Sequence, residues 1–265
     1  DPWTDIFYYD AFYHTSLAKK IDKKLEREVV EGCHRLTIVS QALKDMIKLK
    51  SDKICPGKIL VLHNGFDEED FNIPSDPPDD KFLVTFTGSL SNDNKKMNAF
   101  IKALSKVVTK YKGVNIKFRF IGNIDDSVES LFLENGLEGS FEKMSYVSHN
   151  KAVQYLMDST ACFSTIRRTE KNKGIVSGKI FDYLGSRKPI ICIGPTDGNV
   201  AEILNECEAG KVLDYEDVEG ITAYLSVLIE KWINDPNLDH RNENYLNYSR
   251  KGLTQKISNE MNKLL

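Results

Sequence analysis

A short segment that opens with Ser177, Gly178 and Lys179 holds the residues whose types and spacing are best suited to chemistry. The first turn of a helix carries unpaired N–H groups and the positive end of the helix dipole, so it binds anions readily. Gly178 lets the backbone approach a phosphate closely, and Lys179 adds a positive charge. Asp182 follows one turn later on the same face, where a carboxylate can accept hydrogen bonds from sugar hydroxyls. The segment therefore indicates a site for a nucleotide-linked substrate.

A purely structural interpretation of the same residues stays open at this point. Ser177 could be an N-cap, Lys179 a solvated surface residue, and Asp182 an acid that suits the first turn of a helix. Helices commonly start with glycine or serine, so local chemistry supports the two interpretations about equally. The elements around the segment have to decide between them.

The overall composition argues against several classes of protein. The chain has 265 residues, of which 41% are hydrophobic and 28% are charged, as in globular proteins of about two domains. Its formal net charge of -3 lacks the basic excess typical of nucleic-acid-binding proteins, so we expect no nucleic-acid partner. The five cysteines are scattered, without a Cys-x-x-Cys pair or a cluster with histidine. This pattern indicates neither a disulfide framework nor a zinc site, and it favours a reducing, cytoplasmic location.

Strand and helix patterns alternate along the chain from residue 81 onward. Apolar strands that alternate with helices predict a parallel sheet covered on both faces, which is the α/β class. The expected strands are 81–87, 114–121, 141–147, 160–165, 189–193 and 211–213, with Gly210 as a stop before the last. The expected helices are 95–111, 126–135, 148–157, a short one from Ser177, 199–207, 218–233 and a terminal helix to residue 265.

The residues before 73 form a separate region. They are expected to contain a helix at 14–30, a strand at 35–39, a helix at 41–50 and a strand at 58–62. Residues 73–80 hold three of the eight prolines, so we place a domain boundary there. The chain begins without methionine in a run dense in aromatic residues, and we expect it to be part of a longer protein.

The first expected helix carries a run of lysines. Such a run is usually a solvated face, which is the interpretation we favour. The alternative is contact with an anionic membrane, which would place the protein at the inner face of the cytoplasmic membrane. The lysines are Lys19, Lys20, Lys23 and Lys24.

Four loops follow strands of the expected sheet and could contact a ligand. They contain Gly88-Ser89, residues 146–149, residues 165–168 and the segment from Ser177. In open parallel sheets, ligands bind beyond the carboxyl ends of the strands. Because these ends lie at one edge of the sheet, the four loops come together there. This arrangement favours the phosphate-site interpretation of the Ser177 segment.

Several strings in the chain resemble a known family. From residue 81 to 229 the chain resembles the nucleotide-sugar-binding domain of retaining glycosyltransferases with the GT-B fold, family 4 group, and in particular members that build bacterial surface polysaccharides. The strings are FTGSL at 86–90, YVSHN at 146–150, GKIFDYLGSRKPI at 178–190 and GPTDGN at 194–199. Weaker similarity, with DPW at 1–3, TIVS at 37–40 and LHNGFD at 62–67, extends to the N-terminal domain of that family.

The resemblance implies a GT-B-type, Rossmann-like fold and a division of the chain. Residues 1–72 would be the C-terminal part of a truncated acceptor-side domain, 73–80 a linker and 81–230 the domain that binds the sugar donor. Residues 231–265 would return toward the first domain. The resemblance also implies no cofactor and no metal ion, with a nucleotide-diphosphate sugar as the donor substrate.

Residue roles are implied by position. Lys179 would be the catalytic residue that holds the diphosphate, Asp182 would accept the ribose hydroxyls, and Tyr146 and Val147 would border the base. The full set implied to bind the donor is Gly88, Ser89, Lys95, Tyr146, Val147, Arg167, Ser177, Gly178, Lys179, Ile180 and Asp182.

The chain departs from the family pattern at two positions. Gly174 stands where the family has an acid eight positions before Asp182, and Ser89 stands where many members have arginine. The sequence therefore supports diphosphate and ribose binding better than the choice of sugar. Lys96 is an alternative to Lys95 as an auxiliary cation.

The implied activity is transfer of a sugar from a nucleotide-diphosphate sugar to a glycan or lipid-linked acceptor in surface polysaccharide biosynthesis, by a retaining and metal-independent reaction. We expect these residues to bind the donor but to transfer little or no sugar. Two alternatives stay open: a nucleotide-sugar epimerase, and a degenerate module that binds nucleotides or other proteins.

Overall fold

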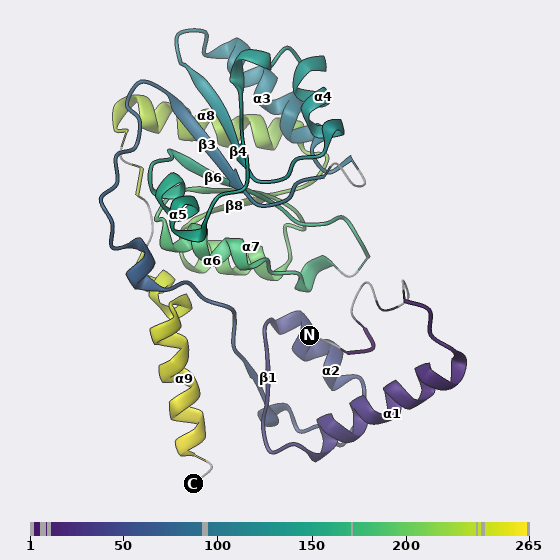
Figure 1. The fold of residues 1–265 in the computed structure, drawn as a ribbon. Helices are drawn as coiled ribbons and strands as arrows, with labels where there is room; N and C mark the ends of the chain where they lie inside the picture. Colours follow the sequence, from purple (N-terminus) through teal and green to yellow (C-terminus); the bar gives the residue numbers. More distant parts are fainter. Residues whose placement is uncertain are drawn as a thin grey trace.

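A parallel sheet, with six strands among the residues that the structure describes, forms the centre of the larger part of the molecule (Figure 1). The computed structural model describes residues 3–5, 9, 12–91, 95–170, 172–236, 238–239 and 242–263, so Asp1 and Pro2 of the DPW string lie outside it. The strands are β3 (Phe82–Thr87), β4 (Ile116–Ile121), β5 (Phe141–Met144), β6 (Ala161–Thr165), β7 (Ile190–Ile193) and β8 (Gly210–Leu213). Their order in the sheet is β5-β4-β3-β6-β7-β8.

Helices cover both faces of this sheet, as the sequence predicted (Figure 1). On one face lie α3 (Asn98–Lys110), α4 (Asp126–Glu134) and α8 (Val218–Asn234), and on the other α5 (His149–Met157), α6 (Gly178–Gly185) and α7 (Asn199–Glu206). The first face is rich in phenylalanine, with the rings of Phe100 and Phe163 centred 4.1 Å apart. The strands have both faces buried, which is why they read as continuous apolar runs.

The sheet opens between β3 and β6. The chain builds outward from β3 to β5, then returns to place β6 on the other side of β3. β3 pairs with β4 along its whole length to Thr87↔Ile121, but with β6 only at Val84↔Ala161 and Thr85↔Cys162. The two strands therefore separate at their carboxyl ends. In doubly wound sheets, this reversal point is where a ligand binds.

A smaller unit precedes the sheet. It contains α1 (Ser16–Gly32), α2 (Gln41–Lys48) and a parallel pair, β1 (Leu36–Ile38) with β2 (Ile59–Val61). Its small core is separate from the two clusters that cover the large sheet and includes Val30, Ile47 and Ile59. None of the helices in the described part of the chain is both long and apolar enough to cross a lipid bilayer.

Two segments connect the units. The first runs from the end of β2 through the 3-10 turn η3 (Glu68–Phe71), and the second runs through η7 (Glu243–Tyr248) into α9 (Arg250–Asn262). Two backbone hydrogen bonds join these segments: Phe66 N–H donates to Tyr248 O (3.2 Å), and Arg250 N–H donates to Phe66 O (2.8 Å). In Figure 1, α9 runs down from the larger unit toward the level of the smaller one.

The observed elements follow the predicted order, with differences at their ends. The helix expected at 95–111 begins only at Asn98, and the strand expected at 141–147 ends at Met144. Gly210 was expected to stop a helix before a strand at 211–213, but it is the first residue of β8. A Cβ built at Gly210 would lie 2.1 Å from Ile190 O, so a glycine is needed where β8 meets β7.

Candidate functional site

Lys179 extends from the first turn of α6 to the open end of β3. Its Nζ lies 4.3 Å from the ring centroid of Phe86, the penultimate residue of that strand. Gly88 follows the strand with φ +107°, and a Cβ built there would lie 2.7 Å from Lys179 Cε and 2.9 Å from Nζ. The absence of a side chain at Gly88 therefore makes room for the lysine. The ammonium group stands where β3 and β6 separate.

The surroundings of Lys179 favour a bound anion. Burial, and secondarily the charge of Lys96, lower the pKa of Lys179 from 10.5 to about 8. Within the described part of the chain, no carboxylate forms an ion pair with Lys179. Two lysines that repel each other at the edge of an apolar core are stabilised by a negative ligand between them. The site therefore suits a polyanion such as a diphosphate.

A buried hydroxyl at this edge of the sheet lacks a hydrogen-bond partner in the structure described. Thr165, the last residue of β6, has its Oγ1 buried without a hydrogen-bond partner in the structure described. Buried polar groups usually have partners, so an unpaired one at the end of a central strand calls for an explanation. A polar ligand at the open end of the sheet would supply one.

The start of α6 is open to a ligand. Ser177 is the N-cap, but its side chain makes no capping hydrogen bond. Ile180 N–H donates to Ser177 O (3.1 Å), which leaves the N–H groups of Gly178 and Lys179 without an acceptor in the described structure. No protein atom lies within 4 Å of a Cβ built at Gly178, so the fold itself does not require glycine there.

Asp182 lies in different surroundings from Lys179. It is half-buried, and burial raises its pKa above the usual 3.8. His149 and Arg250 oppose this rise, whereas the carboxylate of Asp70 adds to it. His149 Nε2 lies 3.1 Å from Asp70 Oδ2, so Asp182 faces η3 and the start of α5. The two predicted residues share a helix face but do not form an ion pair.

The other predicted residues near Lys179 differ in how deeply they are buried. Ile180 is wholly buried in the core, so only its backbone can meet a ligand. Lys95 is exposed with φ +58°, whereas Lys96 is buried next to Lys179 and its Nζ donates to Ser91 Oγ (3.3 Å). The alternative cation, Lys96, is therefore the one that the fold brings to the site.

The outer loops of the same edge are exposed. Ser89 follows Gly88 at the surface, and Tyr146 is 81% exposed beyond the end of β5, with Val147 half-buried beside it. Arg167 is exposed after β6. Its neighbour Arg168 turns toward the loop before α8, where it pairs with Glu216 at 2.7 Å. These loops line the carboxyl edge without forming a closed wall.

Gly174 contacts the smaller unit. Its carbonyl accepts a hydrogen bond from Ser40 Oγ (3.1 Å), and a Cβ built there would lie 3.0 Å from the Cβ of Ala42. Close by, Ala42 N–H donates to Asn199 Oδ1 (3.1 Å). An acid at position 174 would have to displace the start of α2. The departure from the family pattern thus coincides with a contact that the sequence did not reveal.

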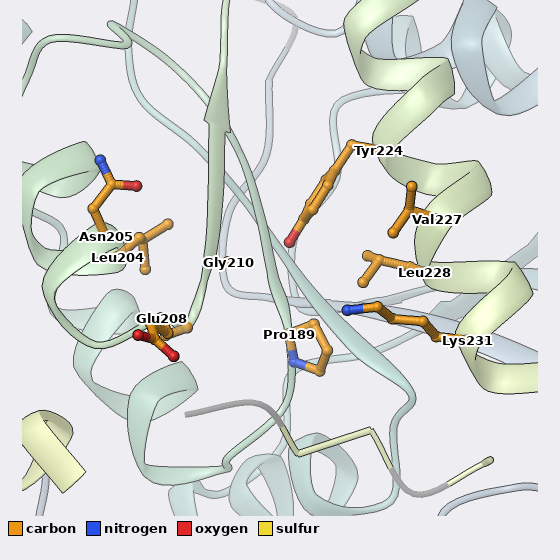
Figure 2. Close-up of a pocket in the computed structure, with 10 residues that line it drawn as sticks. Pro189, Leu204, Asn205, Glu208, Gly210, Tyr224, Val227, Leu228 and Lys231 are labelled. Carbon is orange, nitrogen blue, oxygen red and sulfur yellow. The ribbon is translucent and has the colours of Figure 1, made fainter. Parts of the chain in front are cut away.

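A cavity of about 240 Å³ lies at the opposite edge of the sheet (Figure 2). It is lined where β7 and β8 begin, and Figure 2 shows Tyr224 and Lys231 of α8 facing Pro189 and Gly210. This is the amino edge, away from Lys179, so the cavity is separate from the candidate site. Among the described residues, no group of three or more His, Cys, Asp or Glu side chains could hold a metal ion.

Several solved structures share this fold at low sequence identity. The chain matches HepE of Anabaena, solved with UDP-glucose, at 13% identity and a TM-score of 0.69, over 98% of this chain and 71% of that one. It matches TarM of S. aureus, solved with UDP, at 14% identity and a TM-score of 0.61, over 94% and 48%. Sucrose-phosphate synthase of Thermosynechococcus elongatus matches at 12% identity and a TM-score of 0.61, over 98% of this chain and 64% of that one.

These likenesses confirm the α/β, GT-B-type fold expected from the sequence. The chain spans from about half to seven-tenths of the length of the three proteins. No curated protein sequence matches it. A family model described as glycosyl transferases group 1 matches residues 81–231, from β3 to near the end of α8. Since this match covers more than half of the chain, the protein belongs to the glycosyl transferases group 1 family.

Proposed function

We propose that this chain binds a nucleotide-diphosphate sugar as the donor part of a glycosyltransferase. The observation that carries the proposal is the position of Lys179, whose ammonium stands at the open end of β3 beside Gly88 and Lys96 without a carboxylate partner in the described structure. The family supports it, and so do relatives solved with UDP-glucose and with UDP. The likeness to those relatives concerns the fold alone.

In this proposal the diphosphate lies between Lys179 and the first turn of α6. The bond from the anomeric carbon of the sugar to the diphosphate breaks through an oxocarbenium-like state. That carbon then bonds to a hydroxyl oxygen of a glycan or lipid-linked acceptor, and the hydroxyl proton goes to the departing diphosphate. Lys179 and the free N–H groups of Gly178 and Lys179 stabilise the charge that develops on the departing diphosphate. Because these groups supply positive charge at that point, we propose that the reaction needs no metal ion. That it retains the configuration of the sugar is proposed from the resemblance to retaining glycosyltransferases alone. The carboxylate of Asp182 accepts hydrogen bonds from the ribose hydroxyls, and Tyr146 and Val147 border the base.

The proposed division of the chain follows the expected boundaries. Residues 1–72 form part of an acceptor-side domain, 81–230 bind the donor, and 231–265 return to the first domain. The apolar stripe of α1 supports this, because Leu17 and Val29 are 68% and 55% exposed and a further layer of that domain would cover them. Without that layer we expect donor binding and little transfer. Two expectations stay predictions: that the α1 lysines contact a membrane, and that the protein acts in surface polysaccharide synthesis.

Calorimetry with UDP-, GDP- and ADP-linked sugars tests the proposal. We expect one nucleotide class to bind with a one-to-one stoichiometry. The predictions that follow are stated for UDP, because two relatives were solved with UDP-glucose and with UDP. Failure of all three to bind would overturn the donor-site assignment. Interconversion of a donor sugar without any acceptor would instead favour the epimerase alternative.

Binding of UDP is expected to weaken as the pH rises. Lysine is charged below its pKa, and the pKa of Lys179 is about 8 in the free protein. The attraction for a diphosphate is therefore largely present near neutral pH and is lost as the pH passes through that value. Between about pH 7 and about pH 9 we expect the affinity to fall several-fold. Calorimetry on the protein and on Lys179→Gln checks this, since the variant should show a flatter profile. An equal slope in both proteins would contradict the assignment.

Gly178→Ala is expected to separate binding from stability. Alanine meets no protein atom there and favours a helix, so the melting temperature should stay the same or rise slightly. The added methyl would stand where a phosphate approaches the backbone, and we expect UDP affinity to fall by about tenfold. Gly113→Ala is the matched control, because its Cβ also meets open space, far from α6. Equal affinities in the two variants would argue against close approach at Gly178.

A further inference from the structure

Thr87 has a backbone N–H that the sheet cannot satisfy. Along β3, alternate residues direct their N–H groups to opposite neighbours. Gly88 N–H donates to Ile121 O of β4 (2.8 Å), so Thr87, one residue earlier, points its N–H toward β6. Pairing with β6 ends two residues earlier, at Thr85↔Cys162. The separation of the strands that opens the site therefore leaves this N–H without a ladder partner.

Tyr183 provides the missing acceptor. Its hydroxyl oxygen lies 3.1 Å from Thr87 N and accepts the hydrogen bond, and it lies 3.4 Å from Thr87 Oγ1. The side chain is wholly buried. Burial raises the pKa of Tyr183, so the phenol stays neutral at any ordinary pH. A single tyrosine on α6 thus satisfies the N–H group of β3 that the separation from β6 leaves without a partner in the sheet.

The same helix carries Lys179, four residues and about one turn before Tyr183. Residues four apart on a helix lie on one face, so both side chains project toward the end of β3. Tyr183 contacts Thr87, and Lys179 lies against the next residue, Gly88. The two side chains of α6 therefore contact neighbouring residues at the end of β3.

We propose that Tyr183 is a positioning residue: its hydrogen bond to Thr87 N–H holds α6 against the end of β3 and so keeps Lys179 over Gly88. The consequence for ligand binding rests on the proposed function, whereas the geometry of the ligand-free protein does not. Lys96 is the charged group that the structure places against Lys179, and it belongs to the segment before α3.

Tyr183→Phe removes only the hydroxyl and leaves Thr87 N–H without an acceptor. In the ligand-free variant we expect faster hydrogen exchange at the Thr87 amide. As the helix relaxes and the Lys179 side chain gains water, we also expect the pKa of Lys179, measured by NMR of its side chain, to rise from about 8 toward 10.5. The affinity for UDP should fall by at least about threefold.

Tyr248→Phe is the matched control. Tyr248 is also a buried phenol beside α6, with its ring centred 5.9 Å from that of Phe181, but its hydroxyl donates to Glu206 (2.7 Å). The Tyr248→Phe variant should lose comparable stability. The pKa of Lys179 and the hydrogen exchange of the Thr87 amide should stay as they are in the parent protein. If both variants shifted these two quantities alike, Tyr183 would have only a general structural role.

The outcomes separate this inference from the proposed function. Unchanged Thr87 exchange and unchanged Lys179 pKa in Tyr183→Phe would overturn the positioning role, whether or not UDP binds. If the parent protein bound no nucleotide, the proposed function would fail, and the two NMR readouts would still decide the role of Tyr183. Should the variant not fold, the parent protein suffices, because a fast-exchanging Thr87 amide there would refute the hydrogen bond.

Discussion

Replacing Lys179 with alanine is expected to weaken UDP binding by at least about tenfold, which is ~1.4 kcal/mol. The reason is that Lys179 brings a side-chain positive charge to the open end of β3. Its removal leaves the diphosphate to the backbone N–H groups of α6 and to cations farther from Gly88, such as Lys96. Isothermal titration calorimetry at low ionic strength measures the change most directly, since screening weakens charge–charge attraction.

The same substitution should not destabilise the protein. Burial and the repulsion from Lys96 already lower the pKa of Lys179, so the charged form is disfavoured in the folded state. Thermal unfolding of Lys179→Ala should therefore occur at an equal or higher temperature. Lys106→Ala is the control for net charge, because Lys106 is an exposed lysine of α3 that pairs with Glu219. If Lys179→Ala bound UDP as tightly as this control, the chain would be better explained as a degenerate interaction module.

Gly122→Ala is expected to cause the largest loss of stability of the changes considered. Gly122 follows β4 with φ +125°, and a Cβ there would lie 2.4 Å from Gly88 O, a backbone atom that cannot move aside alone. Strain at this φ and the clash together should cost at least about 3 kcal/mol. Because the contact is with Gly88, the folded fraction should also bind UDP less tightly. Urea unfolding monitored by circular dichroism gives the free energy of unfolding.

Gly136→Ala provides the matched comparison. Gly136 also has a positive φ, +68°, but nothing lies within 4 Å of a Cβ built there. Its replacement should cost only about 1 kcal/mol of backbone strain. The difference between the two variants gives the combined cost of the clash with Gly88 and of a φ of +125°, which lies beyond the left-handed region that residue 136 occupies. Equal losses would mean that the turn after β4 can shift away from Gly88 without resistance.

The order of elements and the edge that holds the site could be predicted from the sequence because both depend on local patterns. The run Ile190–Ile193 is apolar on every residue, as expected of a strand buried on both faces. Parallel strands place their carboxyl ends together, so four loops could be assigned to one edge from the sequence alone. This is why Gly88 and Lys179, 91 positions apart in the chain, could be assigned to one edge.

What the sequence did not reveal depends on contacts between distant segments. The choice between Lys95 and Lys96 follows from a left-handed backbone at Lys95, which turns the next residue inward. The role of Tyr183 depends on where β3 and β6 separate, which no pattern within either strand encodes. The contact of Gly174 with Ser40 joins residues 134 positions apart. In each case the spacing of residue types along the chain carries no signal.

The two segments that connect the units limit how far the chain can be truncated without exposing α6. Phe66 and Tyr248 lie outside the residues that match the family model, yet both are buried in the same cluster as Phe181 of α6. A polypeptide trimmed to 81–231 would leave these positions vacant and expose the underside of the helix that carries Lys179. The span that matches the family model is therefore shorter than the span whose residues pack against α6.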